Sequence, residues 1–500
     1  MIISLVVKSE CICMFPGPEP EPREDVVDES IDSGVVYPDC SDSVFQLTEA
    51  QFAQRELVRI AYLRECGKDP SAERFLRDAT VPDHGIRLDP RRIEDRVIIA
   101  LMDQPLIQRT RSIRQLGTAH LVFMDGNHVR FAHGVGSGAL AAQAIEIIAS
   151  RANRMAEAEI RKYSPAVVAV SISHDVGHVA TGSHLGESMW FPNEKKAHEK
   201  IGRRFVGEDL GFQNCLRTLD SKNPHLLDHV LAIMDEDSSL PPWTWKMVSG
   251  GGWNIDREDW TLRDSVHCGV NYGRHDRSIL LNNLVVTDEG DLAIRERGLE
   301  VMEQFFEARK HLYNSVYYHE VCRVAFEMFV KLAERARELY AAKKLETADP
   351  RMQSVLSATT SEDLSVPCLL GMTESWFGYH LEAWTQSRDP ILSDYATKLL
   401  TRKPFKHFDD TPENRERLTA IVSAAGLDPN YYLLEVEPVE HKHDKDLSSA
   451  LRVLARDGKV GNLEDYSQVM HAFQGMQGVA LGALLAVPEE VFVRGVSFQN

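Results

Sequence analysis

An apolar run that leads directly into histidines and an aspartate constrains this chain more than any other feature. Residues 164–173 read SPAVVAVSIS, and SHDVGHVATGSH then brings His174, Asp175 and His178. The run predicts a buried helix, on whose continuation His174 and His178, four residues apart, would share one face. Burying so many polar groups is costly unless they are paired. Imidazole and carboxylate together bind Fe, Mn, Zn or Mg-type ions; the alternative is a helix end with hydrogen-bonded histidines.

Two clusters on either side of this stretch add arginines and carboxylates. In NHVRFAHGVGSG, Arg130 and His133 are three residues apart and would point the same way on a helical turn. The alternative is a surface arginine and a core histidine. In NIDREDWTLRD, one helix face would present two carboxylates and an aromatic ring, with an arginine beside the first: Asp256, Trp260, Asp264 and Arg257. The alternative there is a solvated helix with ordinary charge pairs.

A fourth cluster, ARKHLYNSVYYHE, repeats the four-residue spacing with Arg309, Tyr313 and Tyr317. An aromatic stripe of this kind is more often part of a core. An arginine at one end nevertheless suits the wall of a phosphate-and-sugar site, because its planar guanidinium pairs with phosphate oxygens. The sequence has no glycine-rich phosphate loop of the Walker type. Arginines would therefore have to hold the phosphates.

The order of these clusters resembles the metal site of the HD-domain phosphohydrolases. The similarity is greatest to the deoxynucleoside triphosphate triphosphohydrolases, both the bacterial enzymes and the metazoan enzyme that also has a SAM domain. Nothing in residues 1–45, which we expect to be an acidic disordered leader, resembles a SAM domain. The resemblance extends from about Thr80 to Phe408 through these ordered stretches: DHGIRLDP, IRQLGTAHLVF, HVRFAHGVGSGALA, SHDVGHVATGSH, KAHEKIG, DREDWTLRD, EARKHLYNSVYYHE and WFGYHLEAWTQSRDPILSDYATKLLTRKPFKHF.

The resemblance implies a site and a reaction. One divalent metal (Mn, Fe, Mg, Co or Zn) would be held by His133, His174, Asp175 and Asp256, with further Mg²⁺ carried in by the nucleotide. A dNTP would be split into deoxynucleoside and inorganic triphosphate, with His178 and His198 as acid–base groups beside the α-phosphate. The substrate-binding residues would be Gln115, Arg130, Arg257, Trp260, Asp264, Arg309, Tyr313, Tyr317 and Tyr318.

Within this set the resemblance assigns the sugar contacts and marks some departures. Gln115 and Asp264 match groups near the 3′-hydroxyl, and Tyr317 matches a ring that excludes a 2′-hydroxyl. The spacing from His178 to His184 is one residue longer than in the metazoan enzyme. Four residues differ in type from that enzyme, which leaves the base preference open: Trp260 for tyrosine, Arg257 for lysine, Tyr313 for histidine and Tyr318 for glutamine.

Two other functions of the site remain compatible with the sequence, and nucleic-acid binding through a local patch stays open beside them. One is an HD nucleotidase or phosphodiesterase that acts on another nucleotide. The other is a catalytically silent nucleotide-sensing protein, against which the retention of every expected metal and acid–base position argues. Asp103 and Arg111 match residues that bind a regulatory guanine nucleotide in the metazoan enzyme, so a regulatory nucleotide is a further expected partner.

The expected fold is mostly α, an HD-domain helical core with a small mixed α/β C-terminal region. Helices are predicted over 47–66, over 92–117, interrupted by Pro105, and over 138–163 and 294–345, with strands within 430–441 and 450–460. The expected organisation is an acidic disordered leader (1–45), an N-terminal helical segment (46–90), an HD catalytic domain (91–340) and a C-terminal region (341–500).

Charge and cysteine content limit the partners. The net charge of −19 argues against a protein held to nucleic acid or to a membrane by a positive field. The eight cysteines form no C-x-x-C pair, so we expect reduced thiols in a cytoplasmic protein. A homo-oligomer is the expected assembly, again by resemblance.

Overall fold

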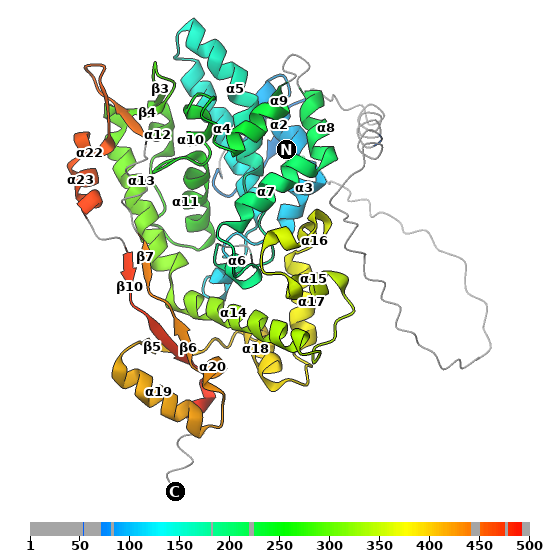
Figure 1. Cartoon of the computed structure of the whole chain (residues 1–500). Coiled ribbons are helices and arrows are strands. Elements are labelled where there is room, and N and C mark those ends of the chain that lie inside the picture. The colour runs from blue at the N-terminus through cyan, green and yellow to red at the C-terminus, as the bar shows by residue number, and fades with distance from the viewer. Residues whose placement is uncertain are drawn as a thin grey trace, which may run out of the picture. The chain divides into compact units, whose positions relative to one another are not determined.

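Two long helices, α4 (Arg130–Ala149) and α5 (Arg154–Ser173), pack against each other in the helical body (Figure 1). The prediction of one helix over 138–163 is wrong, because the chain turns between them. Asn153 begins α5 by accepting hydrogen bonds from two backbone N–H groups of its first turn. The helices approach closely at Gly134, where a Cβ atom would lie 2.8 Å from the carbonyl oxygen of Ile172. This contact brings the start of α4 to the end of α5.

Three helices cover this pair: α2 (Ile93–Met102) and α9 (Leu226–Met234) pack on α5, and α11 (Ile255–His267) packs on α4. Asn254 caps α11, because its side chain accepts a 2.8 Å hydrogen bond from the backbone N–H of Arg257. The cap places Asp256 in the first turn of a helix that lies against α4.

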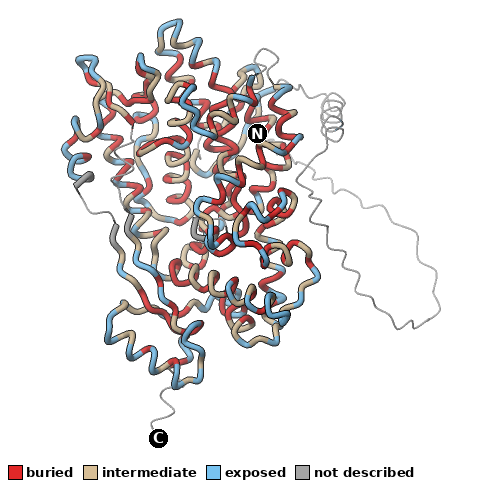
Figure 2. Tube along the Cα trace, in the orientation of Figure 1, coloured by how far each residue is buried: buried red, intermediate tan, exposed pale blue. Residues whose placement is uncertain are grey.

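The other helices of the described residues form the rest of the body and parts of the C-terminal region. They are α3 (Pro105–Arg109), α6 (His184–Trp190), α7 (Ala197–Glu208), α8 (Leu210–Leu219), α10 (Trp243–Lys246), α12 (Arg277–Asn283), α13 (Leu299–Leu312), α14 (Glu320–Ala341), α15 (Pro350–Ser357), α16 (Val366–Leu370), α17 (Glu374–Trp384), α18 (Pro390–Leu400), α19 (Pro412–Ala424), α20 (Pro429–Tyr432), α22 (Leu463–Tyr466) and α23 (Gln468–Gly475). Figure 2 shows buried positions running along the helices of the body.

The helix predicted over 294–345 is interrupted where the fourth cluster lies. α13 ends at Leu312, a single π-helical turn covers Tyr313–Tyr317, and α14 begins at Glu320. His319 caps α14 by accepting a 3.2 Å hydrogen bond from the backbone N–H of Val321. The π turn changes the direction of the tyrosine side chains relative to a regular helix.

The helical prediction for 92–117 is confirmed only in its first part. α2 ends at Met102, and Pro105 begins α3, as expected from a proline at the first helical position. The chain leaves helical geometry at Ile113, and Arg114 then forms an isolated antiparallel β-bridge with Val129.

Small sheets complete the described residues. Two of them lie wholly in the C-terminal region: β5–β11–β6, all antiparallel, and β10–β7. A four-stranded sheet, β3–β4–β8–β9, joins strands of the body to the C-terminal region through the parallel β4–β8 pair. The strands are β3 (Leu284–Val286), β4 (Leu292–Arg295), β5 (Lys406–Asp409), β6 (Leu434–Val436), β7 (Val439–His441), β8 (Arg452–Leu454), β9 (Val460–Gly461), β10 (Val479–Leu481) and β11 (Leu484–Val487). The mostly α fold with a mixed C-terminal region is confirmed.

This computed structural model describes residues 54, 72–81, 85–181, 184–219, 225–441, 451–475 and 479–492. The predicted leader and, apart from Gln54, the helix predicted from 47 to 66 lie outside the described residues. Residues 72–90 were included in the N-terminal helical segment, yet they contain an antiparallel pair, β1 (Arg74–Leu76) and β2 (Ile86–Leu88). Gly85, at a φ of 58°, accounts for part of this difference, because a regular helix cannot include that conformation.

Among the described residues, no helix combines the length and the apolar character needed to cross a bilayer. Within the part of the chain that the structure describes, no disulfide is formed, and Cys215, Cys268, Cys322 and Cys368 are buried. The predicted domain boundaries stay predictions.

Candidate active site and metal centre

Four side chains from three parts of the chain meet where α4, the end of α5 and α11 come together. His133 lies in the first turn of α4, His174 and Asp175 follow α5, and Asp256 lies in the first turn of α11. The Nε2 atoms of His133 and His174 are 3.2 Å apart, and both approach Oδ1 of Asp256, at 3.0 and 3.2 Å. Each Nε2 also lies 3.6 Å from an oxygen of Asp175. The structure thus brings together residues that span 123 positions in sequence.

The other imidazole nitrogens show which atoms of this cluster are available to a metal. Nδ1 of His133 donates to Oδ2 of Asp259 at 2.8 Å, and Nδ1 of His174 donates to the carbonyl oxygen of Ser171 at 2.8 Å. These bonds orient both Nε2 atoms toward the carboxylates, as the outer hydrogen bonds of metal-binding histidines usually do. Two imidazole nitrogens and two carboxylates form a donor set that fits a divalent transition metal such as Mn²⁺ or Fe²⁺. His133, His174, Asp175 and Asp256 could therefore hold such an ion.

The cluster is charged when it holds no metal. Burial lowers the pKa of His133, but hydrogen bonds to Asp256 and Asp259 outweigh it and raise that pKa to about 10. For Asp175, burial raises the pKa, and the Arg130 guanidinium and neighbouring histidines hold it well below the usual value. The carboxylates are thus ionised near neutral pH, and metal binding would release protons from the imidazoles.

Arg130 lies beside this cluster rather than away from it. Its guanidinium forms an ion pair with Asp175, and its Nη2 donates to the carbonyl oxygen of Gln115 at 3.3 Å. Arg130 and Gln115 are both buried, and Oε1 of Gln115 has no hydrogen-bond partner among the described residues. The two predicted substrate-binding residues are therefore neighbours, and both lie beside the four-residue cluster of His133, His174, Asp175 and Asp256, called the metal cluster below.

His178 and His198 form a second group that shares Asp175 with the first. Their rings stack with centroids 4.3 Å apart and planes at 11°. Nε2 of His178 lies 3.4 Å from Oδ1 of Asp175. Oε1 of Glu187 lies 2.6 Å from Nδ1 of His198 and 3.4 Å from Nδ1 of His178. The structure thus brings both predicted acid–base histidines to the metal cluster and adds Glu187, which the sequence reasoning missed.

The shared helix face predicted for His174 and His178 is not present. α5 ends at Ser173, and residues 174–177 form turns. Gly177 allows this turn to lie directly on α7, since a Cβ atom there would be 2.0 Å from the carbonyl oxygen of His198. Burial, with Arg130 and His198 nearby, keeps the pKa of His178 well below its usual value. His178 is therefore neutral in this arrangement.

An aromatic wall extends from the cluster along α11 and the π turn. The ring of Trp260 meets Tyr313 and Tyr317 edge to face, at 6.1 and 5.6 Å between centroids. Tyr318 lies 5.5 Å from Tyr313. The guanidinium carbon of Arg309 is 5.6 Å from the centre of the Trp260 ring. The structure therefore brings these predicted substrate-binding residues together.

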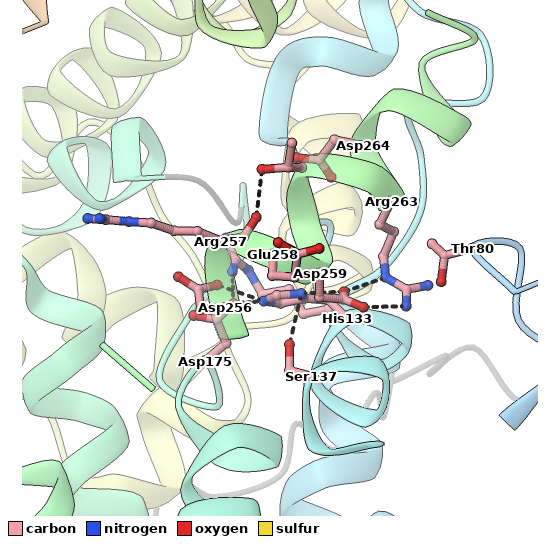
Figure 3. Close-up of polar contacts among 12 residues, drawn as sticks. Thr80, His133, Ser137, Asp175, Asp256, Arg257, Glu258, Asp259, Arg263 and Asp264 are labelled. Carbon is pink, nitrogen blue, oxygen red and sulfur yellow. Dashed lines mark hydrogen bonds and ion pairs between the residues drawn. The ribbon is translucent and has the colours of Figure 1, made fainter. Parts of the chain in front are cut away.

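The arginines near this wall share one backbone contact. Nη1 of Arg257 and Nη1 of Arg309 both donate to the carbonyl oxygen of Gly252, at 3.2 and 3.3 Å. Two cations that lie this close would attract an anionic ligand. Figure 3 shows Arg257 extending from α11 away from the His133–Asp259 pair.

Asp264 links the wall to a buried histidine. Its Oδ2 accepts a 2.6 Å hydrogen bond from the hydroxyl of Tyr317, and its Oδ1 lies 2.8 Å from Nε2 of His128. The ring of His128 stacks on His267 with centroids 4.3 Å apart. Burial and Asp264 hold the pKa of Tyr317 well above its usual value. The predicted sugar contacts Asp264 and Tyr317 are thus bonded to each other.

The two residues expected to contact a regulatory nucleotide have protein partners. Nη1 of Arg74 donates to Oδ2 of Asp103 at 3.1 Å. Arg111 donates to Gln108 at 2.8 Å and lies over the ring of Phe131. A regulatory role for Asp103 and Arg111 remains a prediction.

Sequence reasoning missed the carboxylates and hydroxyl that support the histidines: Asp259, Glu187 and Ser137, whose Oγ lies 3.4 Å from Nδ1 of His133. Asp259 stands three residues after Asp256, on an adjacent helical position, and this spacing was a usable signal. Glu187 gives no such signal, because its contact with His198 depends on how α6 and α7 pack.

The chain is similar to known proteins over much of its length. Residues 275–364 match the HD associated region. The protein YwfO of Bacillus subtilis is 24% identical over 394 residues, which are 77% of this chain and 87% of its own. The deoxynucleoside triphosphate triphosphohydrolases SAMHD1 of Gallus gallus and Homo sapiens are 23% identical over 338 residues and 25% over 271 residues. These matches cover 62% and 48% of this chain but 53% and 41% of theirs, so the chain spans about half of each.

Solved structures share the fold. The crystal structure of a phosphohydrolase from Bacteroides thetaiotaomicron has a TM-score of 0.70 at 20% identity, and the match covers 84% of this chain and 100% of that one. A hypothetical protein from Aquifex aeolicus has a TM-score of 0.61 at 19% identity, over 86% of this chain and 100% of its own. Together, the HD associated region and the relatives make the chain similar to the HD-domain phosphohydrolases and, among them, to the deoxynucleoside triphosphate triphosphohydrolases, and the solved structures show the same fold.

Proposed function

We propose that this protein is a metal-dependent dNTP triphosphohydrolase, which converts a dNTP and water into the deoxynucleoside and inorganic triphosphate. One observation carries the proposal. The four-residue donor cluster contacts the stacked His178–His198 pair through Asp175, and α11 carries both Asp256 of the cluster and Asp264 of the Tyr317–Asp264 pair. This arrangement supplies groups for the metal, the reacting phosphate and the sugar of one nucleotide.

The reacting phosphate would lie beside the metal cluster. His133, His174, Asp175 and Asp256 would hold a divalent ion, which would supply Lewis acidity for a phosphoryl oxygen and for the attacking water. The departing 5′-oxygen is a poor leaving group and needs a proton. We assign this proton to His198, because an imidazole can carry a proton near neutral pH, whereas the neutral His178 stacks on His198 and contacts Asp175. Oε1 of Glu187 lies on the Nδ1 side of both rings, so each Nε2 atom faces away from Glu187.

The rest of the nucleotide is held by charge and shape. Arg130, Arg257 and Arg309 offset the charge of the triphosphate, as a guanidinium does for phosphate oxygens. Tyr317, packed against Trp260, presents a ring edge that would crowd a 2′-hydroxyl. Asp264 and Gln115 lie in reach of the 3′ side in this assignment.

A second candidate function is hydrolysis of a different nucleotide by the same cluster. The aromatic and arginine wall also suits a nucleoside monophosphate or a cyclic nucleotide. The relatives named as dNTP triphosphohydrolases favour the first candidate. We further propose a reduced, cytoplasmic homo-oligomer. The described cysteines, which form no disulfide, are in keeping with the reduced state, and light scattering of the purified protein tests the assembly.

The test of function is product analysis. Purified protein is incubated separately with each dNTP, with each matching rNTP and with a cyclic nucleotide, in Mn²⁺, Mg²⁺, Fe²⁺ or Co²⁺, and the products are separated by chromatography. We expect inorganic triphosphate and deoxynucleoside in equal amounts. Release of monophosphate or pyrophosphate from a dNTP would contradict the proposal and favour the second candidate.

A further inference from the structure

A buried chain of polar contacts leads from the metal cluster to the N-terminal part of the described residues. Nδ1 of His133 and Nε of Arg263 both donate to Oδ2 of Asp259, each at 2.8 Å. Nη2 of Arg263 donates to Oδ1 of Asp259 at 3.0 Å and to Oδ2 of Asp78 at 3.0 Å. The side chains of His133, Asp259 and Arg263 are at most 2% exposed, and that of Asp78 is 8% exposed.

Asp78 is held in its own loop by local hydrogen bonds. The loop follows β1, and Oδ1 of Asp78 accepts from the backbone N–H of Thr80 at 2.7 Å and from its hydroxyl at 2.5 Å. The other carboxylate oxygen is thereby directed to Arg263. Figure 3 shows the Arg263 guanidinium between Asp259 and Thr80. The loop therefore supplies a carboxylate to a pair buried behind a metal ligand.

A glycine in α4 provides the space for this pair. A Cβ atom at Gly136 would lie 2.2 Å from Nη2 of Arg263 and 2.5 Å from Oδ1 of Asp259. Such distances are far inside van der Waals contact, so any side chain at this position would displace the ion pair. The second glycine of the stretch HGVGSG, Gly136, is therefore required for steric reasons.

Sharing of charge couples Asp78 to His133. Burial lowers the pKa of Arg263, but Asp259 and Asp78 outweigh it and raise that pKa above its usual value. The Arg263 guanidinium pairs with both carboxylates, so it offsets the negative charge of Asp259 only in part. Asp259 therefore remains a strong acceptor for the hydrogen bond from His133. Without the charge of Asp78, Arg263 would neutralise Asp259 more fully. The His133 hydrogen bond would weaken, and His133 would become a poorer ligand.

We infer that Asp78 and Arg263 are positioning residues for His133, and that the loop after β1 is part of the support of the metal centre. The inference deepens the proposed function and rests on its metal cluster. It assigns to a segment outside the HD motif a role that is read out by metal affinity, independently of any substrate.

The experiment titrates Mn²⁺ into metal-free full-length protein by calorimetry. Asp78→Asn removes the charge and keeps a side chain of the same shape that still accepts from Thr80. We expect its Mn²⁺ affinity to fall by at least about threefold, and that of Asp259→Asn by about tenfold or more, since partners of metal-binding histidines typically contribute about 10–100-fold. Thr80→Val is the matched control: it removes a hydrogen bond in the same loop, keeps the carboxylate and should stay within about twofold of the original affinity.

A second pair of variants tests the inference even if Asp78→Asn does not fold. Gly136→Ala leaves every charge in place and displaces Arg263, so its Mn²⁺ affinity should also fall by at least about threefold. Gly378→Ala, in α17, is its control, because a Cβ atom there meets nothing within 4 Å. Melting curves of the metal-free variants report their folding.

The outcomes separate this inference from the proposed function. Folded Asp78→Asn and Gly136→Ala proteins with the original affinity would overturn the inference, as would an equal loss in Thr80→Val. Mn²⁺ binding by the original protein without hydrolysis of any dNTP would overturn the proposed function and still test the inference through affinity. An original protein that does not bind Mn²⁺ would overturn both.

Discussion

The hydroxyl of Tyr317 donates a 2.6 Å hydrogen bond to Asp264, and the same ring packs edge to face on Trp260 and Tyr313. Tyr317 is therefore fixed in position before any ligand binds. A fixed ring can exclude a hydroxyl group by crowding, whereas a mobile ring would move aside. Because the π turn rather than a regular helix carries Tyr317, its placement depends on contacts that only the folded chain provides.

Tyr317→Ala should admit ribonucleotides. Removal of the ring relaxes the crowding at the 2′ position, so the dNTP-to-rNTP ratio of kcat/KM should fall by at least about tenfold, or about 1.4 kcal/mol. Tyr317→Phe is the control, because it keeps the ring and loses only the hydrogen bond to Asp264. Its dNTP-to-rNTP ratio of kcat/KM should stay within about threefold of the ratio of the original protein. If Tyr317 is only core, Tyr317→Ala will lose stability and both activities in parallel at an unchanged ratio. Steady-state rates and melting temperatures on one preparation distinguish these outcomes.

Glu187→Gln should slow catalysis without removing the metal. Glu187 contacts His178 and His198 and takes no part in the four-residue metal cluster. An amide is a weaker acceptor than a carboxylate, so the orientation of both imidazoles is less favoured, and kcat should fall by at least about tenfold. Glu199→Gln changes an exposed glutamate next to His198 on α7 and should leave kcat unchanged. Metal content is measured on the same samples; its loss in Glu187→Gln would assign Glu187 to the metal centre instead.

Asp209 should make stability depend on pH in a defined direction. It is buried before α8, its Oδ2 has no hydrogen-bond partner among the described residues, and burial raises its pKa from 3.8 to about 6. An acid whose pKa is higher in the folded protein opposes folding once it ionises. Its cost therefore grows as pH rises from about 4 to about 6 and is complete above that range.

Asp209→Asn should accordingly stabilise the protein at pH 7.5 by about 1–3 kcal/mol, and by much less at pH 4.5. Asparagine can still accept the hydrogen bond that Asp209 receives from the backbone N–H of Phe212 at 2.6 Å. Urea unfolding at both pH values measures the difference, with the exposed Asp228→Asn as a control. A less stable Asp209→Asn protein at pH 7.5 would show that the carboxylate contributes favourably where it lies.

Features set by short-range pattern could be predicted from the sequence. The apolar run of α5, the helix of α11 and the proline that begins α3 follow from local residue types and spacing. The proximity of His133, His174, Asp175 and Asp256 was expected from a family resemblance, because no local pattern joins residues so far apart in sequence.

Features set by packing could not be predicted in this way. The turn between α4 and α5 lies inside a stretch with continuous helical character, and Asn153 reads as a cap only once the turn is known. The strand β4 pairs with β8 from the C-terminal region, a contact between distant segments. Glu187 and Asp78 become important through tertiary contacts with His198 and Arg263.

The central claim is that one metal cluster performs dNTP hydrolysis, and Asp175→Asn tests it most directly. Oxygen atoms of Asp175 lie 3.6 Å from Nε2 of His133 and 3.6 Å from Nε2 of His174, and Asp175 also contacts His178. Loss of its charge therefore affects the ion and the acid–base pair together. Metal content by elemental analysis and triphosphate release from dNTP by chromatography are measured on the same Asp175→Asn preparation, with Asp228→Asn as the exposed control. We predict that both quantities fall to background while the circular dichroism spectrum is unchanged. Full triphosphate release with unchanged metal content in Asp175→Asn would contradict the account.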